Sequence, residues 1–131
     1  MLLLYHYALT HQTLVLGTSN KSEILLGYGT KFGDFAADVE VIGSLWKTEV
    51  IELAKELEIP EEIIQRPPTA ELSVGQTDAG DLGGDYAKLD DILKKLEANN
   101  FELLEESDEL TKKTLERVLT NKHKTELTPV L

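Results

Sequence analysis

Apolar residues recur at two different spacings in the first part of the chain, and each spacing predicts one kind of element. Residues 1–9 place three large side chains on one helical face, which predicts an amphipathic or buried helix: Leu2, Tyr5 and Leu9. Residues 13–17 (TLVLG) form a short apolar run that ends in glycine, and this is typical of a buried strand in a parallel sheet. Residues 38–42 are compatible with a second short strand.

Polar caps, glycine and proline mark the ends of the next two predicted helices. One helix follows Asn20, since Asn20 and Glu23 have the spacing of a capping box, and it ends at Gly27. The other follows Ser44 as its cap and is stopped by Pro60. Its apolar face is expected to consist of Val50, Leu53, Ala54 and Leu57.

Two more helices are predicted in the last third of the chain. Asp85 caps the first of them, which ends at Asn99 and Asn100. Its apolar face consists of Tyr86, Leu89, Leu93 and Leu96. Ser107 caps the second, whose inward residues are expected to be Leu110, Thr114, Leu115, Val118 and Leu119.

Two glycine-rich segments separate these elements. Residues 27–38 contain three glycines and are predicted to form a loop whose backbone approaches something closely. Residues 66–85 contain four glycines and two prolines, and a loop of this length in a small domain is usually functional or disordered. Short apolar runs that alternate with helical patterns predict an α/β fold with few parallel strands.

The composition excludes several classes of function. The chain has 131 residues, a formal net charge of −11, 41% hydrophobic residues and no cysteine. This length fits one domain, and the lack of cysteine excludes a disulfide scaffold, a thiol nucleophile and a Cys-ligated metal. The acidity argues against binding to nucleic acid or to anionic membranes, but a nucleotide needs only a few local cations and backbone N–H groups.

The apolar residues 1–9 have no basic residue before them and are too short to cross a bilayer. We therefore expect neither a secretory signal nor a membrane span. A chain that opens directly within an apolar helix is more typical of the middle of a larger fold than of a domain edge.

The turn from the first predicted strand into the next helix is the first candidate site. Thr18 and Ser19 place hydroxyl groups at the carboxyl end of a parallel strand, where α/β folds bind their ligands. Glu23 could reach a divalent cation from the same turn. Spacing alone favours the simpler alternative, in which these residues only cap a helix.

Two lysines provide further candidates for anion binding. Lys31 lies in a glycine-rich loop and could pair with a phosphate, while Asp38 could bind a ribose hydroxyl; an ordinary solvated loop has the same composition. Lys47 lies in the first turn of a predicted helix, where the helix dipole disfavours a cation. A bound phosphate would offset this cost, and the alternative is an exposed lysine whose stem covers Trp46.

The start of the long loop is the last candidate. Pro67 and Pro68 stiffen the backbone and present the hydroxyl of Thr69, and the glycines beyond them permit the motion of a lid. The alternative is a disordered surface segment. The three histidines have no metal-ligand spacing, and no Ser/His/Asp nucleophilic set is visible.

The order of these motifs resembles that of one enzyme family. The segments in question are LGTSNKSE (16–23), LGYGTKFGD (26–34), LWKTEV (45–50), RPPTAEL (66–72) and GQTD (75–78). Together they resemble the C-terminal half of the ammonia-dependent NAD synthetases, over nearly the whole chain. The resemblance implies the C-terminal part of a Rossmann-like fold of the adenine-nucleotide hydrolase type that ATP pyrophosphatases share. It also implies a cytoplasmic enzyme that adenylates deamido-NAD with ATP and Mg²⁺, after which ammonia displaces AMP to give NAD.

The resemblance also implies roles for individual residues. Thr18 and Thr69 resemble ATP contacts, Lys47 resembles the catalytic lysine that neutralises the ATP phosphates, and Glu23 resembles a magnesium ligand. The expected deamido-NAD contacts are Lys31, Asp38, His123 and Lys124. Residues 1–65 then form the strand and helix half of the nucleotide site, 66–85 a mobile substrate loop, and 86–131 the C-terminal helices and tail.

The family's Ser-Gly-Gly-x-Asp-Ser phosphate-binding motif does not occur in the 131 residues. We therefore expect the chain alone to be inactive and to need an N-terminal half from another chain. The family forms homodimers with deamido-NAD at the subunit interface, so the alternative is a non-catalytic dimerisation or interaction module. A stand-alone nucleotide- or metal-binding protein is a third hypothesis, and a glutamine-dependent parent enzyme is also compatible with the sequence.

Overall fold

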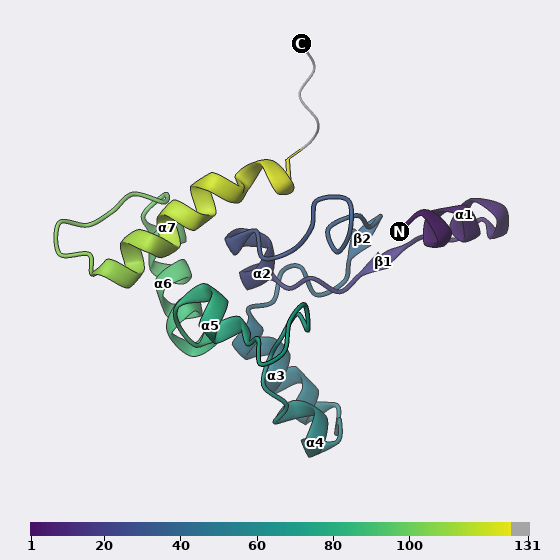
Figure 1. Ribbon diagram of the computed structural model, residues 1–131, viewed down its shortest axis with the longest axis horizontal. Coiled ribbons are helices and arrows are strands. Elements are labelled where there is room, and N and C mark those ends of the chain that lie inside the picture. The colour runs from purple at the N-terminus through teal and green to yellow at the C-terminus, as the bar shows by residue number, and fades with distance from the viewer. Residues whose placement is uncertain (127–131) are drawn as a thin grey trace, which may run out of the picture.

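The computed structural model describes residues 1–126 as an α/β fold in which helices predominate (Figure 1). The end of the predicted tail, residues 127–131, lies outside the described residues. The elements are α1 (Leu2–His11), β1 (Leu16–Gly17), α2 (Lys21–Leu26), β2 (Val39–Glu40), α3 (Lys47–Glu56), α4 (Glu61–Ile64), α5 (Asp78–Leu82), α6 (Tyr86–Ala98), α7 (Glu109–Asn121) and the 3₁₀ helix η1 (Lys122–Lys124). Among the helices of residues 1–126, none is long and apolar enough to cross a membrane.

The two predicted strands form a short parallel pair, and α2 lies in the connection between them. Leu16 is opposite Val39 and Gly17 is opposite Glu40. The prediction of a parallel sheet is confirmed, but the prediction of a buried strand is wrong for Leu16. Its side chain is 60% exposed, because it finds no cover within the described part of the chain.

The N-terminal helix α1 forms as predicted, but its apolar side chains remain largely exposed. It lies beside β1 and β2, away from α6 and α7 (Figure 1). Leu2 is 90% exposed and Leu9 is 81% exposed, and Ala8 is the buried residue of this helix. The prediction of an amphipathic or buried helix was therefore wrong. A helix that is apolar on every side has no polar face to present to water.

The hydrophobic core lies where α2, α6 and α7 meet. It consists of Leu26, Trp46, Leu82, Tyr86, Leu89, Leu93 and Val118. The predicted face of α6 is confirmed, since all four of its residues are buried. Leu119 of α7 is exposed instead of inward, as are Leu53 of α3 and Leu57, which directly follows α3. α3 extends past the core toward α4 (Figure 1).

Two of the predicted helix caps were wrong. Trp46, and not Ser44, is the N-cap of α3. Asp108, and not Ser107, is the N-cap of α7, where its carboxylate accepts the Thr111 N–H at 2.8 Å. The Ser107 hydroxyl instead accepts the Leu104 N–H in the preceding turn. The predicted caps of α2 and α6 are confirmed.

Two short helices lie in segments where none was predicted. α4 follows directly after Pro60, which is its N-cap. The prediction that Pro60 stops α3 was wrong, since α3 already ends at Glu56 with Leu57 as its C-cap. α5 lies within the predicted long loop, so that loop is not continuous. Thr77 caps α5 by accepting the Gly80 N–H at 3.2 Å, and Gly83 ends it in the left-handed conformation. Helices of four or five residues give too little periodicity to be recognised in a sequence.

Gly27 joins α2 to the following loop at a position where a side chain would be strained and would also collide. Its φ is +58°, and a Cβ would lie 2.2 Å from the Cβ of Asn121. We expect Gly27→Ala to lower the free energy of unfolding by about 2–4 kcal/mol. Gly75 is the matched control, because it has φ +79° but nothing within 4 Å of its Cβ position. Gly75→Ala should cost only about 1 kcal/mol in urea denaturation, and equal losses for both variants would contradict the packing argument.

Candidate functional site

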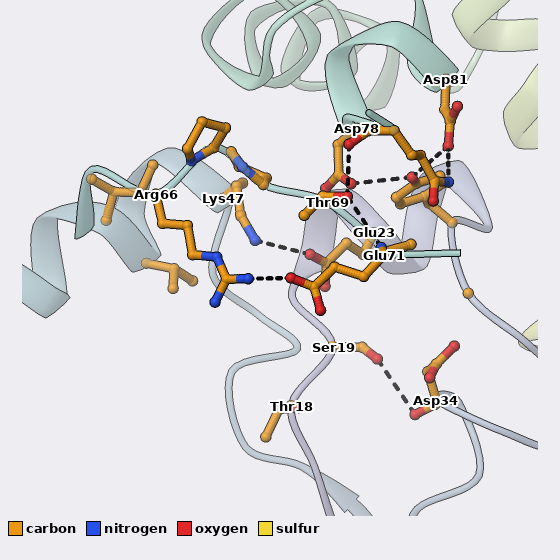
Figure 2. Close-up of a pocket in the computed structure, with 18 of the residues that line it drawn as sticks. Thr18, Ser19, Glu23, Asp34, Lys47, Arg66, Thr69, Glu71, Asp78 and Asp81 are labelled. Carbon is orange, nitrogen blue, oxygen red and sulfur yellow. Dashed lines mark hydrogen bonds and ion pairs between the residues drawn. The ribbon is translucent and has the colours of Figure 1, made fainter. Parts of the chain in front are cut away.

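Most of the predicted site residues meet at one open cleft of about 1170 Å³. Its walls are the turn from β1 into α2, the helices α3 and α4, the loop that follows α4, and α5 (Figure 2). The predicted residues that line it are Thr18, Glu23, Lys47, Thr69 and Lys124. Segments far apart in the sequence therefore converge on one space.

Glu23 both caps α2 and faces the cleft. The Asn20 side chain accepts the Glu23 N–H at 3.0 Å, and the Glu23 Oε2 accepts the Asn20 N–H at 3.1 Å. The other carboxylate oxygen accepts from the Lys47 Nζ at 3.1 Å. Capping occupies one oxygen, and the ion pair aims the other toward the cleft.

Lys47 is held beside Tyr86, and it is not the exposed lysine of the alternative interpretation. Its Nζ lies 5.3 Å from the centre of the Tyr86 ring. Lys21 and Lys94 lie over Trp46 instead. The Lys47 side chain is only 21% exposed, so its ammonium is partly desolvated and points toward Glu23 (Figure 2).

Carboxylates offset the cost of placing Lys47 at the start of α3. The Glu49 side chain accepts the Trp46 N–H at 2.9 Å, and the Asp90 side chain accepts the Thr48 N–H at 2.9 Å. Negative charge near a helix N-terminus is stabilising. The lysine is therefore stable in the first turn with protein groups alone as its partners.

Thr69 lies in a loop that is closed by its own hydrogen bonds. The Thr69 hydroxyl donates to the Gln76 carbonyl at 2.8 Å and accepts the Glu71 N–H at 3.1 Å. The Asp78 N–H donates to the Pro68 carbonyl at 2.9 Å, which ties the start of the loop to α5. Arg66 forms an ion pair with Glu71 at the edge of the cleft (Figure 2).

Two tyrosines hold the buried carboxylate of Asp78, and sequence reasoning missed this cluster. The Tyr28 hydroxyl donates to Asp78 at 3.1 Å and to Asp81 at 2.9 Å, and the Tyr86 hydroxyl donates to Asp78 at 3.0 Å. Burial raises the pKa of both tyrosines above the ordinary value; the hydrogen bond to Asp81 adds to this for Tyr28, and the charge of Glu23 for Tyr86. The cluster fastens α5 to α2 and α6.

Hydrogen bonds from Gln76 and then from Tyr28 lower the pKa of the Asp81 carboxyl. The stability that these bonds contribute is therefore present above the ordinary pKa of aspartate. It is lost as the pH falls through the lowered value.

Replacing either tyrosine of this cluster by phenylalanine should destabilise the chain. Tyr86→Phe leaves an oxygen of the buried Asp78 without its donor, which is expected to cost about 1–3 kcal/mol. Tyr28→Phe should fall in the same range. The control is Tyr7→Phe on α1, where the tyrosine is 57% exposed. Urea denaturation measures the loss of unfolding free energy in the three variants. A loss in Tyr7→Phe as large as that in Tyr86→Phe would contradict this prediction.

The remaining predicted residues lie outside this cleft. Lys31 lines a second cavity of about 510 Å³, which Lys124 also lines. The Lys31 Nζ donates to the His123 carbonyl at 2.6 Å, and the Lys124 Nζ donates to the Gly27 carbonyl at 2.8 Å. The Asp38 carboxylate accepts the Val15 N–H at 2.8 Å, so it supports the start of the sheet. Asp38 and His123 are absent from the lining of both cavities.

Comparison with known proteins gives the family of the chain. The sequence model of the family described as NAD synthase matches residues 1–128. The chain belongs to the NAD synthase family. It is 46% identical to the NH₃-dependent NAD⁺ synthetase of Helicobacter acinonychis, over 97% of this chain and 52% of the relative. It is 48% identical to that of Methanoregula boonei, over 95% of this chain and 49% of the relative.

Two solved structures of related enzymes have a similar fold. An NMN synthetase from Francisella tularensis matches with a TM-score of 0.85 and 34% identity, over 99% of this chain and 51% of the other. The NH₃-dependent NAD synthetase from Campylobacter jejuni, in complex with the nitrate ion, matches with a TM-score of 0.74 and 38% identity. This match covers 98% of this chain and 49% of the other. The predicted Rossmann-like fold is therefore confirmed. This NAD synthase chain spans about half the length of the curated relatives it matches.

The donor set of this NAD synthase cleft fits Mg²⁺ only in part. Within residues 1–126, no group of three or more histidine and acidic side chains could hold a metal ion. Mg²⁺ is usually bound through one or two carboxylates together with substrate phosphates. The Glu23 carboxylate lines the cleft, so it can supply one ligand if phosphates supply others.

Proposed function

We propose that this chain carries the ATP-binding and magnesium-binding part of an enzyme that amidates deamido-NAD with ammonia. The observation that carries the proposal is the pair formed by Glu23 and Lys47. These side chains lie 3.1 Å apart in one cleft, although they are 24 residues apart in the sequence. Thr18 and Thr69 line the same cleft. A carboxylate, an ammonium and two hydroxyls are the groups that a magnesium-bound triphosphate needs.

Each group has a role in adenylation of the deamido-NAD carboxylate. Lys47 neutralises negative charge on the ATP phosphates, and this effect is largest in a partly desolvated cleft. Glu23 and the phosphates would hold Mg²⁺, which would make the α-phosphate of ATP more electrophilic toward the carboxylate, and pyrophosphate would leave as the new bond forms. Thr18 and Thr69 orient the nucleotide. Lys31 and Lys124 offer positive charge to deamido-NAD in the neighbouring cavity.

A second polypeptide segment is part of the proposal, since the phosphate-binding motif of the family does not occur in these 131 residues. The apolar side chains of α1 and β1 support it, because Leu2, Leu9 and Leu16 are all at least 60% exposed. Exposed apolar surface of this kind usually marks an interface. We propose that the other half of a NAD synthase covers it, so that the remaining phosphate contacts reach the cleft. A non-catalytic dimer of this chain would use the same surface.

The similarity to an NMN synthetase makes a mononucleotide the second candidate substrate. The Francisella tularensis NMN synthetase matches this chain with a TM-score of 0.85, and the Campylobacter jejuni NAD synthetase matches it with 0.74. The chemistry is the same for both substrates, since each would present a nicotinate carboxylate for adenylation. Identity points the other way, at 38% for the NAD synthetase and 34% for the NMN synthetase, so we favour deamido-NAD.

A hybrid enzyme tests the proposal and separates the two substrates. It joins the segment that precedes the matched region in the Helicobacter acinonychis enzyme to residues 1–131 of this chain. With ATP, Mg²⁺ and ammonia, the hybrid should form NAD from deamido-NAD faster than it amidates nicotinate mononucleotide. The reverse preference would replace the proposed substrate by the mononucleotide. A folded hybrid that amidates neither would contradict the proposed function.

A further inference from the structure

Asp90 is a buried carboxylate that does not line the cleft. It lies on α6 and is only 1% exposed. Its oxygens accept hydrogen bonds from the Ser22 hydroxyl at 2.5 Å, the Thr48 N–H at 2.9 Å and the Thr48 hydroxyl at 2.8 Å. Burying a charge is costly unless hydrogen bonds compensate for it, and here three donors do so.

The hydrogen bonds of Asp90 come from the residues next to Glu23 and Lys47, the side chains proposed to bind magnesium and phosphate. Ser22 directly precedes Glu23, and Thr48 directly follows Lys47. The Ser22 hydroxyl also accepts the Lys47 N–H at 2.9 Å. Asp90 thus connects the first turns of α2 and α3, which are the two turns that carry the Glu23–Lys47 pair.

This connection replaces the hydrogen bond that an N-cap side chain would make, since the Trp46 side chain makes none. The first two N–H groups of α3 donate to side chains of other helices. The Lys47 N–H donates to Ser22 on α2, and the Thr48 N–H donates to Asp90 on α6. Free N–H groups at a helix start have no partner within the helix. The direction of the first turn of α3 therefore depends on where α6 holds the carboxylate.

We infer that Asp90 is a positioning residue that sets the distance between Glu23 and Lys47 for binding of the magnesium-bound triphosphate. The inference rests on the proposed function, because it concerns the same site. Asp90 acts through Ser22 and Thr48 and does not itself touch the nucleotide. A residue with only a structural role would affect folding stability without a specific link to Lys47.

A double-mutant cycle on the hybrid enzyme tests this link. The dissociation constant of ATP with Mg²⁺ is measured by calorimetry for Asp90→Asn, for Lys47→Ala and for the double variant. Asp90→Asn should raise the dissociation constant about tenfold in the wild-type background. In the Lys47→Ala background, Asp90→Asn should raise the dissociation constant by less than about twofold, because the group that Asp90 positions is gone.

Four further variants separate the positioning effect from a loss of folding. Ser22→Ala removes the hydroxyl between Asp90 and the Lys47 N–H while it keeps the buried charge, and it should weaken ATP binding like Asp90→Asn. Thr48→Ser keeps the hydroxyl and should bind ATP normally, whereas Thr48→Val should not. Val118→Ala, which lies in the core on α7, should lower the melting temperature and leave the dissociation constant unchanged.

The outcomes separate this inference from the proposed function. No ATP binding by the wild-type hybrid would overturn the proposed function and the inference together. Binding by the wild type with unchanged affinity in Asp90→Asn and Ser22→Ala would overturn the inference alone. An equal loss of affinity in both Lys47 backgrounds would also overturn it, since Asp90 would then act independently of Lys47.

Discussion

Replacing Lys47 by alanine is expected to lower the rate of NAD formation by the hybrid enzyme about a thousandfold. Lys47 is the cation among the proposed phosphate-binding groups, and its side chain is only 21% exposed. Its loss leaves charge on the transferring phosphoryl group without compensation in a partly desolvated cleft. The measurement is kcat/KM for ATP at saturating ammonia and Mg²⁺. Lys47→Arg should recover only part of the rate, because a guanidinium is broader than an ammonium.

Lys21 provides a closely matched control for this prediction. Like Lys47, it is the first residue of its helix, it pairs with a glutamate at 2.7 Å, and its Nζ lies over an aromatic ring. It does not line the cleft. Lys21→Ala should therefore change the rate less than about threefold. Similar losses in both variants would show that Lys47 contributes through helix packing and not through charge in the cleft.

Replacing Glu23 by glutamine is expected to lower the rate about a hundredfold and to raise the Mg²⁺ concentration needed for half-maximal activity. Glutamine can still cap α2, since it serves at this position of a capping box as glutamate does. The substitution therefore removes the charge without removing the helix start. The measurement is the rate of NAD formation as a function of Mg²⁺ at fixed ATP.

The control for Glu23 is Glu97, which pairs with Lys21 and whose side chain is 44% exposed. Glu97→Gln should leave the Mg²⁺ dependence unchanged. If Glu23→Gln shows the wild-type Mg²⁺ dependence, then Glu23 is only a cap and an ion-pair partner, and the proposed metal role is wrong.

Features that depend on neighbouring residues in the sequence could be predicted. The capping box of Asn20 and Glu23 and the cap Asp85 were predicted from spacing, because both partners of each bond lie within three residues. The inward face of α6 was predicted because thirteen residues give a clear helical period. The resemblance of the motifs placed Thr18, Glu23, Lys47 and Thr69 in one site, and the cleft brings these residues together.

Features that depend on distant residues could not be predicted. The start of α3 is capped by Ser22 and Asp90, so the local signal of Ser44 was misleading. The cluster of Tyr28, Asp78 and Tyr86 spans 58 residues and has no spacing rule. The buried character predicted for residues 1–9 failed for a related reason, since burial of an apolar helix depends on which surface covers it and not on its own pattern.

Ammonia-dependent NAD formation by the isolated chain and by the hybrid enzyme, measured side by side at equal concentration, tests the central claim most directly. Both reactions contain deamido-NAD, ATP and Mg²⁺, and the Helicobacter acinonychis enzyme serves as the positive control. We predict turnover by the hybrid and none by the 131-residue chain alone. Turnover by the isolated chain would contradict the need for a second segment, and a folded but inactive hybrid would contradict the site itself.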